Sequence, residues 1–343
     1  MQDGMGRGAE PAALLTVDTV GAYAVRRGLI PDASEARVAS LGGGVSNVVL
    51  AVGADDRQVV VKQALPRLRV AEEWLAKRER IATEAAALRW AASATPEAVP
   101  TILDADPAAF TISIARAPLG WTDWKACLLN GDANPAVAAR LGVVLAVWHA
   151  TTRDDPAMAA CFDDAEAFDQ LRVDPYYRTV MARHAEVAPE IAGYVERMAA
   201  TRRCLVHGDF SPKNVLLGEE GLWVIDFEVA HVGDPAFDVA FLLNHLLLKA
   251  VHRPAALDAY ERCALAFMDA YRAGIPAGFG GPATYVHGHV GCLMLARVDG
   301  KSPAEYLTPT EQRTARTLAI ALLRRPPAAL MDIWTMVREV IAA

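Results

Sequence analysis

Three polar side chains between residues 205 and 228 interrupt or follow short apolar segments. Asp209 lies in a polar turn, Asn214 follows five residues later, and Asp226 ends an apolar run. The turn at 218–221 (GEEG) predicts a hairpin that brings Asn214 and Asp226 side by side. One amide oxygen and one carboxylate suit Mg²⁺, which takes its other ligands from phosphate and water. With Asp209 placed to accept a hydroxyl proton, the pattern predicts phosphoryl transfer from a nucleotide.

Taken singly, Asp209 and Asn214 are explained more simply as turn-capping residues, the usual role of Asp and Asn. The combination is more demanding, because HGDxxxxN at 207–214 is followed by an apolar strand and by IDFE at 225–228. The combination therefore favours a catalytic and metal-binding segment over a pair of capped turns.

A glycine-rich segment at 41–47 (LGGGVSN) separates two strand-like runs, at 37–41 and 48–52. Its backbone N–H groups are suited to face phosphate. A plain glycine-rich turn is the alternative.

Lys62 ends a run of three valines, and Glu84 lies on a predicted helix over 71–92. Glu84 shares a helical face with Ile81 and Leu88, so the helix carries a carboxylate on its buried side. Because an unpaired buried carboxylate is costly, a cation must lie opposite, and we expect Lys62 to be that cation. For Lys62 alone, extension to solvent from a strand end is the alternative.

The segments 207–214 (HGDFSPKN) and 225–228 (IDFE) resemble the catalytic and metal-binding segments of the aminoglycoside phosphotransferase and choline kinase family. These are protein-kinase-like enzymes that phosphorylate small molecules. Gly208 stands where protein kinases usually have Arg, and it favours the small-molecule branch. The resemblance covers roughly residues 35–300.

The resemblance implies an ATP- and Mg²⁺-dependent phosphotransferase with Asp209 as catalytic base and with Asn214 and Asp226 as metal ligands. The family often has His where this chain has Ser211, so a γ-phosphate contact at that position, or its replacement by Lys213, stays open.

The segment 41–47 likewise resembles the GGxSN segment of the family, and Lys62 resembles its nucleotide lysine. The expected nucleotide-binding residues are Gly43, Gly44, Ser46, Asn47, Lys62 and Glu84.

Candidate contacts for the phosphate acceptor lie in the C-terminal part of the chain. They are Asp169, Arg172, Glu228, His231 and Arg297. An internal salt bridge explains Arg297 equally well. The acidic residues at 163–169 would suit a polycationic aminoglycoside, and they equally fit the polar first turn of a helix.

The expected acceptor is a hydroxyl of a sugar-like or amino-alcohol metabolite, since the segment 123–131 (DWKACLLNG) resembles methylthioribose-kinase-like members of the family. An aminoglycoside antibiotic phosphotransferase and a non-catalytic nucleotide-binding protein on the same fold are the alternatives.

Strand-like runs dominate before about residue 117 and helical periodicity dominates after it, which predicts an α+β fold. By resemblance, the fold is protein-kinase-like and bilobal. A small β-rich N-lobe with one main helix (1–117) would bind the nucleotide, and a larger, mostly helical C-lobe (118–343) would hold the catalytic and substrate-binding residues. The helices expected in the C-lobe are 135–150, 163–171, 189–202, 235–250, 255–273, 282–298 and 308–342, the last broken near Pro326 and Pro327.

The chain of 343 residues carries a net charge of −7, which argues against nucleic acid as a partner because phosphate backbones need a basic face. Its five cysteines are widely spaced and lack a CxxC pair, as expected for free thiols in a reducing compartment. We see neither a signal peptide nor a membrane span and expect a cytoplasmic enzyme acting on a small molecule. The sequence does not indicate an oligomeric state.

Overall fold

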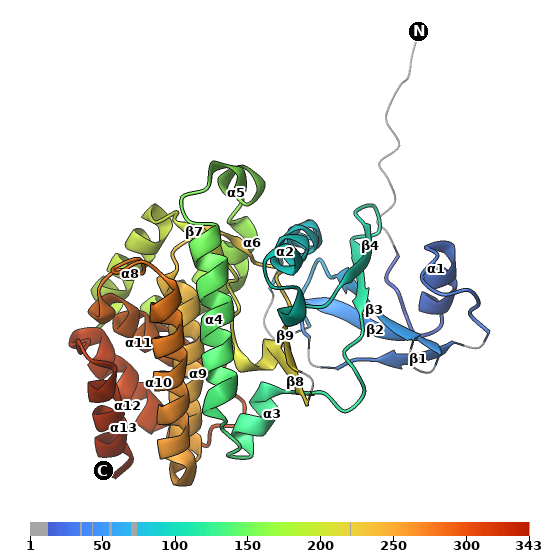
Figure 1. The fold of residues 1–343 in the computed structure, drawn as a ribbon. Helices are drawn as coiled ribbons and strands as arrows, with labels where there is room; N and C mark the ends of the chain where they lie inside the picture. Colours follow the sequence, from blue (N-terminus) through green and yellow to red (C-terminus); the bar gives the residue numbers. More distant parts are fainter. Residues whose placement is uncertain are drawn as a thin grey trace. The chain divides into compact units, whose positions relative to one another are not determined.

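The computed structural model describes residues 13–34, 36–42, 44–54, 57–69, 74–219 and 221–342. It divides into two compact units (Figure 1). Unit 1 comprises Met1–Ala85 and Ile102–Arg116, and unit 2 comprises Ala86–Thr101 and Ala117–Ala343. Residues 86–101 group with unit 2, where the Thr95 hydroxyl accepts a 2.8 Å hydrogen bond from the Trp148 indole. The assignment of nucleotide binding to the N-terminal part stays a prediction.

Unit 1 is built on an antiparallel five-stranded sheet in the order β1-β2-β3-β5-β4. The strands are β1 (Arg37–Ser40), β2 (Asn47–Ala54), β3 (Arg57–Ala64), β4 (Ile102–Asp106) and β5 (Thr111–Ala115). The β-branched runs form β2 and β3 as the sequence predicts, and helix α1 (Val20–Arg26) packs its buried side on the sheet. Lys62 lies in the central strand β3, with Val49 and Ile112 as its cross-strand neighbours.

Helix α2 (Arg80–Ala94) is shorter than the predicted helix over 71–92. Residues 70–73 lie outside the described ranges, and helical structure starts only at Arg80. Ahead of it, the Trp74 carbonyl accepts a hydrogen bond from the Leu68 backbone instead of from a helical turn. The buried Arg80 guanidinium donates to the carbonyls of Ser46 and Leu65, which ties the start of the helix to the end of the sheet. A tertiary contact therefore overrides the local helical pattern.

Unit 2 is mostly helical (Figure 1). Its longer helices are α4 (Pro135–Thr151), α8 (Ala188–Ala200), α9 (Ala236–His252), α10 (Leu257–Gly274), α11 (Ala283–Asp299), α12 (Pro309–Arg324) and α13 (Leu330–Ala342). Helix α4 packs along α10, and α9 packs against α10 and α11. The sequence expects each of these helices, including the break between α12 and α13, but misses the short helices α3 (Trp124–Leu129), α5 (Pro156–Cys161) and α7 (Thr179–Arg183).

The segment predicted as one helix over 163–171 is a different structure. Helix α6 (Glu166–Phe168) runs directly into a π-helical segment, η2 (Asp169–Arg178), with Pro175 inside it. Proline has no N–H to donate and clashes with the preceding turn of an α-helix, and a wider turn relieves both problems.

Two small sheets lie among the helices of unit 2. Strand β7 (Cys204–Val206) pairs with β10 (His231–Gly233), and β8 (Val215–Gly218) pairs with β9 (Gly221–Val224) and with β6 (Thr122–Asp123). The predicted hairpin is thus present as β8–β9. Together with the helices, these sheets confirm the predicted α+β class.

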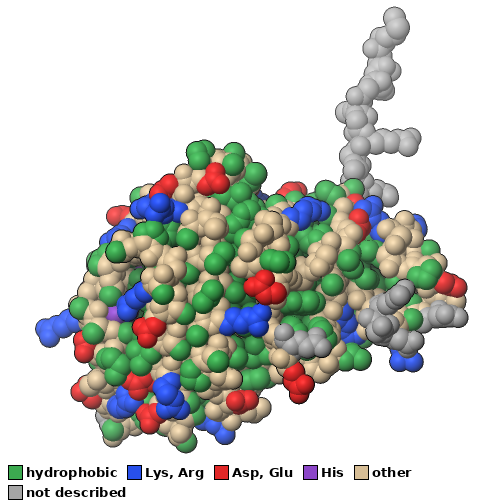
Figure 2. All heavy atoms as spheres, viewed as in Figure 1, with side chains coloured by type: hydrophobic (Ala, Val, Ile, Leu, Met, Phe, Trp, Pro, Cys, Tyr) green, Lys and Arg blue, Asp and Glu red, His purple; other side chains and the backbone are tan. Residues whose placement is uncertain are grey.

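Acidic and basic side chains are interspersed on the face of the molecule drawn in Figure 2. Within the described ranges, none of the helices is both long enough and apolar enough to cross a lipid bilayer.

Candidate active site

Asp209 lies in the loop between β7 and the 3₁₀ turn η3 (Pro212–Asn214), and only 1% of it is exposed. Its Oδ2 lies 2.8 Å from Nη2 of Arg172 and 2.9 Å from Nζ of Lys213. Burial raises the pKa of the Asp209 carboxyl, but the two cations outweigh burial and hold its pKa below the ordinary value. The buried carboxylate therefore stays ionised, with one oxygen held in place.

Arg172 projects from the π-helical segment η2 and is itself buried. Besides the contact with Asp209, its Nε donates to the Gly208 carbonyl at 2.8 Å. One guanidinium thus holds both the backbone and the carboxylate of the loop. A planar fork of five donors suits this double contact better than a lysine would.

The loop is braced from behind by Asp238 on α9. Its two carboxylate oxygens accept the backbone N–H groups of His207 (2.7 Å) and Gly208 (2.9 Å), which fixes the backbone of the loop. The imidazole Nε2 of His149 lies 3.3 Å from the same carboxylate, a partner that nothing in the sequence pattern indicates.

Glycine is required at position 208. Its φ is +76°, a region that side chains disfavour, and an added Cβ would lie 2.8 Å from Val229 Cγ2. The position just before Asp209 therefore has no room for the larger residue that protein kinases carry there.

Asn214 and Asp226 flank the open end of the β8–β9 hairpin. The backbone N–H of Ile225 donates to the Asn214 carbonyl at 2.9 Å, so Asp226 follows directly beside Asn214. The Asn214 side-chain nitrogen donates to the Asp209 carbonyl at 3.0 Å, and its amide oxygen is then the atom able to bind a cation. Asp226 itself has φ +75°, a conformation of the kind that clusters at functional sites.

In unit 1, Nζ of Lys62 lies 2.5 Å from Oε1 of Glu84, and both side chains are buried. The predicted ion pair is thus present. Ser46 and Asn47 are buried at the start of β2, and Asn47 donates to the Ser46 hydroxyl. An added Cβ would fit at Gly44, whereas the predicted Gly43 lies outside the described residues.

Residues 37–277 match the model of the phosphotransferase enzyme family (APH), which is more than half of the chain. The chain belongs to this family. The relatives of this family member include methylthioribose kinase 2 of Oryza sativa subsp. japonica, 26% identical over 239 residues. That match covers 62% of this chain and 56% of the rice protein. The methylthioribose kinase of Geobacillus thermodenitrificans is 27% identical over 268 residues, or 70% of this chain and 67% of that kinase.

Solved structures show the same fold. A choline/ethanolamine kinase family protein from Mesorhizobium loti has a TM-score of 0.52 at 20% identity and covers 90% of this chain and 93% of its own. An ethanolamine kinase from Plasmodium vivax has a TM-score of 0.53 at 10% identity, with 94% and 86% covered. These similarities confirm the predicted protein-kinase-like fold of this phosphotransferase-family protein.

The predicted acceptor contacts of this family member fall in different places. Asp169 is half exposed and pairs with Arg178 of the same π-helical segment at 2.7 Å. His231 is buried in β10, contacts the Phe168 ring in a tilted arrangement with 4.1 Å between ring centroids, and packs over Gly233. These contacts give His231 a structural role.

Burial lowers the pKa of the Arg172 guanidinium, but neighbouring charges, Asp209 before Glu228, outweigh burial and raise it. Arg297 is half-buried on α11, and Nη1 donates to the Ser302 hydroxyl at 2.8 Å. In the described part of the chain Arg297 forms no ion pair, and its buried Nε has no hydrogen-bond partner. The internal salt bridge offered as the alternative for Arg297 is absent there.

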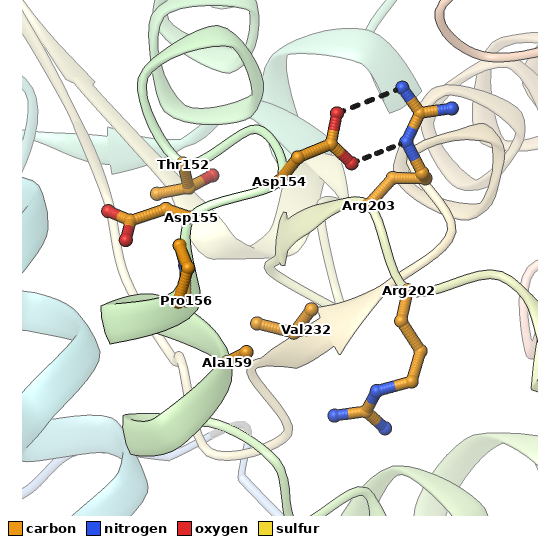
Figure 3. A pocket seen from close by; sticks show the side chains of 8 residues that line it. All are labelled: Thr152, Asp154, Asp155, Pro156, Ala159, Arg202, Arg203 and Val232. Carbon is orange, nitrogen blue, oxygen red and sulfur yellow. Dashed lines mark hydrogen bonds and ion pairs between the residues drawn. The ribbon is translucent and has the colours of Figure 1, made fainter.

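One surface pocket of unit 2 contains none of the predicted residues. It measures about 260 Å³, is lined by residues around Thr152 and Arg203, and contains the Asp154–Arg203 pair at 2.7 Å (Figure 3). This pair is exposed, and two further charged residues, Asp155 and Arg202, line the same pocket.

Proposed function

We propose that this protein is an ATP- and Mg²⁺-dependent phosphotransferase that moves the γ-phosphate to a hydroxyl of a small, sugar-like or amino-alcohol metabolite. The observation that carries the proposal is the buried Asp209 carboxylate, held by Arg172 and Lys213 next to the Asn214–Asp226 pair. Phosphoryl transfer requires a carboxylate that accepts the hydroxyl proton. It also requires two oxygen ligands that hold a cation.

In the proposed reaction, the acceptor oxygen bonds to the γ-phosphorus while the bond to the β–γ bridging oxygen breaks and ADP leaves. The hydroxyl proton passes to Asp209. Because Oδ2 is occupied by Arg172 and Lys213, the acceptor hydroxyl donates to Oδ1. A carboxylate with a lowered pKa is a weak base, so its main contribution is to orient the hydroxyl.

The residues present fit a magnesium ion. Asn214 offers an amide oxygen and Asp226 a carboxylate, an all-oxygen donor set that leaves the other positions to phosphate and water. When bound, the ion would neutralise the phosphate charge. Lys213, whose side chain is 48% exposed, is the cation that we propose meets the γ-phosphate in place of a residue at Ser211.

Unit 1 carries the other expected nucleotide-binding residues. Lys62, oriented by Glu84, would contact the α- and β-phosphates, and the backbone at Gly44, Ser46 and Asn47 would lie over them. The methylthioribose kinases and the family match support a donor nucleotide for this chain as well.

An aminoglycoside acceptor is the weaker candidate, since the acidic side chains that would receive a polycation serve other contacts. Asp163 pairs with Arg202, Asp164 accepts the Glu166 backbone N–H, and Asp169 pairs with Arg178. These contacts already engage the three carboxylates within the protein.

The proposal is tested by incubating the protein with ATP–Mg²⁺ and a metabolite extract and searching by mass spectrometry for a compound that gains one phosphate. We expect such a product with the wild type and not with Asp209→Asn. If ATP–Mg²⁺ raises the Tm of the wild type but no extract fraction yields a phosphorylated product, the protein is a nucleotide-binding protein without this activity.

A further inference from the structure

A buried lysine in unit 2 lacks the acidic partner that its burial demands. Lys249 lies on α9 and is 1% exposed. Its Nζ reaches only the His245 carbonyl of its own helix, at 3.4 Å, and no carboxylate of the described ranges forms an ion pair with it. Burying an unpaired ammonium costs roughly several kcal/mol. A ligand with a negative charge would offset this cost, which favours its binding here.

Other cations surround the same place. Nζ of Lys125 and Nζ of Lys249 lie 6.0 Å and 5.4 Å from the centre of the Tyr306 ring. The pKa of the neighbouring His245 lies well below its usual range, first because the ring is buried and then because Lys249, Arg297, Lys213 and Lys125 all repel its proton. Cations of four different elements therefore act electrostatically on His245, and Lys249 is the one whose Nζ lies within 3.4 Å of its carbonyl.

Two polar atoms in this cluster have unmet hydrogen-bonding capacity. The hydroxyl of Tyr306 and Nε of Arg297 are buried, and neither has a partner among the described residues. A buried donor without a partner costs about 1–3 kcal/mol, and an incoming oxygen ligand would relieve it. The one acidic side chain paired within the cluster is Glu305, which bonds Lys125 and is largely exposed.

Two aromatic side chains of α9, Phe241 and His245, lie between Arg172 and Lys249. The guanidinium of Arg172, paired with Asp209, lies 5.9 Å from the centre of the Phe241 ring, and Phe241 contacts His245 at 5.4 Å. Phe241, His245 and Lys249 repeat every four residues along one side of α9. From Phe241 to Lys249 the helix rises by about 12 Å, which is within the reach of a small metabolite.

From this arrangement we infer that the acceptor carries a negatively charged group, a carboxylate or a phosphate, which binds at Lys249, Arg297, Lys125 and Tyr306 while its hydroxyl lies at Asp209. The inference rests on the proposed function and specifies its substrate class. Arg297 and Lys125 contact the anion directly. The buried Lys249 attracts the anion through its positive charge. Because the same cations repel amino-alcohol and aminoglycoside acceptors, the inference narrows the proposed acceptor class to its sugar-like members that carry an acid group, a sugar acid or a sugar phosphate.

Calorimetry tests the anion site directly. The probes are inorganic phosphate, D-gluconate and uncharged glucitol, each titrated at pH 6.5 into protein saturated with a non-hydrolysable ATP analogue and Mg²⁺, so that the nucleotide site is occupied. We expect at least one anion to bind and glucitol not to bind. Binding of phosphate indicates an acceptor with a phosphate group, and binding of gluconate indicates an acceptor with a carboxylate.

Variants assign the binding to this cluster. Lys249→Met and Arg297→Gln should each weaken anion binding about 10- to 100-fold, the usual cost of one charge-assisted contact. Arg338→Gln is the matched control, because Arg338 is a half-exposed cation of unit 2 whose partners are the exposed Asp258 and the buried Glu261. Absence of anion binding to the wild type, or equal loss in all three variants, would overturn the inference. Arg297→Gln alters a half-exposed side chain and keeps the test valid if Lys249→Met fails to fold.

Failure of this inference and failure of the proposed function give different results. If mass spectrometry identifies a phosphorylated neutral or cationic alcohol, the anion site is wrong and the phosphotransferase stands. If anions bind in a Lys249- and Arg297-dependent way but no acceptor is phosphorylated, the anion site stands and the proposed function fails.

Discussion

Arg172 and Asp209 form a buried ion pair in which Nη2 lies 2.8 Å from Oδ2. Arg172 comes from a π-helical segment and Asp209 from a loop 37 positions later, so the pair ties the proposed catalytic carboxylate to a separate element. Removing one partner of a buried pair leaves an uncompensated charge. The orientation of Asp209 therefore depends on Arg172.

Arg172→Met should lower kcat about 10- to 100-fold, because Asp209 loses the contact that fixes its orientation. The free energy of unfolding should also fall, by roughly 3 kcal/mol, as one charge is left buried. Steady-state kinetics and urea denaturation measure the two effects. Arg178→Gln is the control on the same segment, since its pair with Asp169 is about half exposed and contributes at most about 1 kcal/mol. Equal effects in both variants would remove the special role of Arg172.

Glu84→Gln should raise KM for ATP about tenfold with little change in KM for the acceptor, because Lys62 loses the carboxylate that orients it toward the phosphates. Initial rates measured over a range of ATP concentrations at saturating acceptor give KM for ATP. Glu79→Gln lies at an exposed position next to the same helix and serves as the control. An unchanged KM for ATP in Glu84→Gln would show that the Lys62–Glu84 pair is structural alone.

Gly208→Ala should lower the Tm and abolish most activity. The new Cβ would lie 2.8 Å from Val229 Cγ2 and 2.9 Å from its carbonyl oxygen, at a φ of +76°. Gly193→Ala, in the middle of α8 with open space at the Cβ position, should instead leave the Tm unchanged or raise it, because alanine favours the helix. Differential scanning calorimetry compares the two. A Gly208→Ala variant as stable as the wild type would contradict the tight packing of this loop.

Lys249 should make stability depend on pH. Burial lowers its pKa from the ordinary 10.5 to about 7, with Lys125 and Arg297 lowering it further and Glu305 and Asp123 raising it. Between pH 7 and 10.5 the unfolded chain binds more protons at this position than the folded chain, so its contribution to stability rises with pH in that window. Lys249→Met removes the buried charge and should raise the Tm more at pH 6.5 than at pH 9. A Tm difference that is the same at both values would contradict a charged, unpaired Lys249.

How much the sequence could predict depended on whether the signal was local. The segment 207–214 has its own motif, and the hairpin that follows is fixed by strand periodicity and a glycine turn, so Asn214 and Asp226 are placed correctly beside each other. The pair of Lys62 and Glu84 follows from one argument about burial, and the structure contains it.

Features that depend on tertiary contacts could not be predicted in this way. The π-helical turn that aims Arg172 at Asp209 has no helical periodicity of its own, and Arg172 was only one of several candidate acceptor contacts. Lys249 lies in the strongly apolar helix α9, where a single lysine is normally explained by a stem that extends to solvent. Its burial becomes visible only when α9 is packed against its neighbours.

The most direct test of the account is acceptor-dependent ADP release by the wild type and by Asp209→Asn, measured with the acceptor that mass spectrometry identifies and at saturating ATP–Mg²⁺. Asparagine keeps the shape of the side chain but cannot take the hydroxyl proton or balance the charge of Arg172. We predict that kcat falls about 100-fold or more while the nucleotide Kd from calorimetry changes less than about threefold. An Asp209→Asn variant with wild-type kcat, or a wild type that releases no ADP with any acceptor, would contradict the assignment of Asp209 as the base of a phosphotransferase.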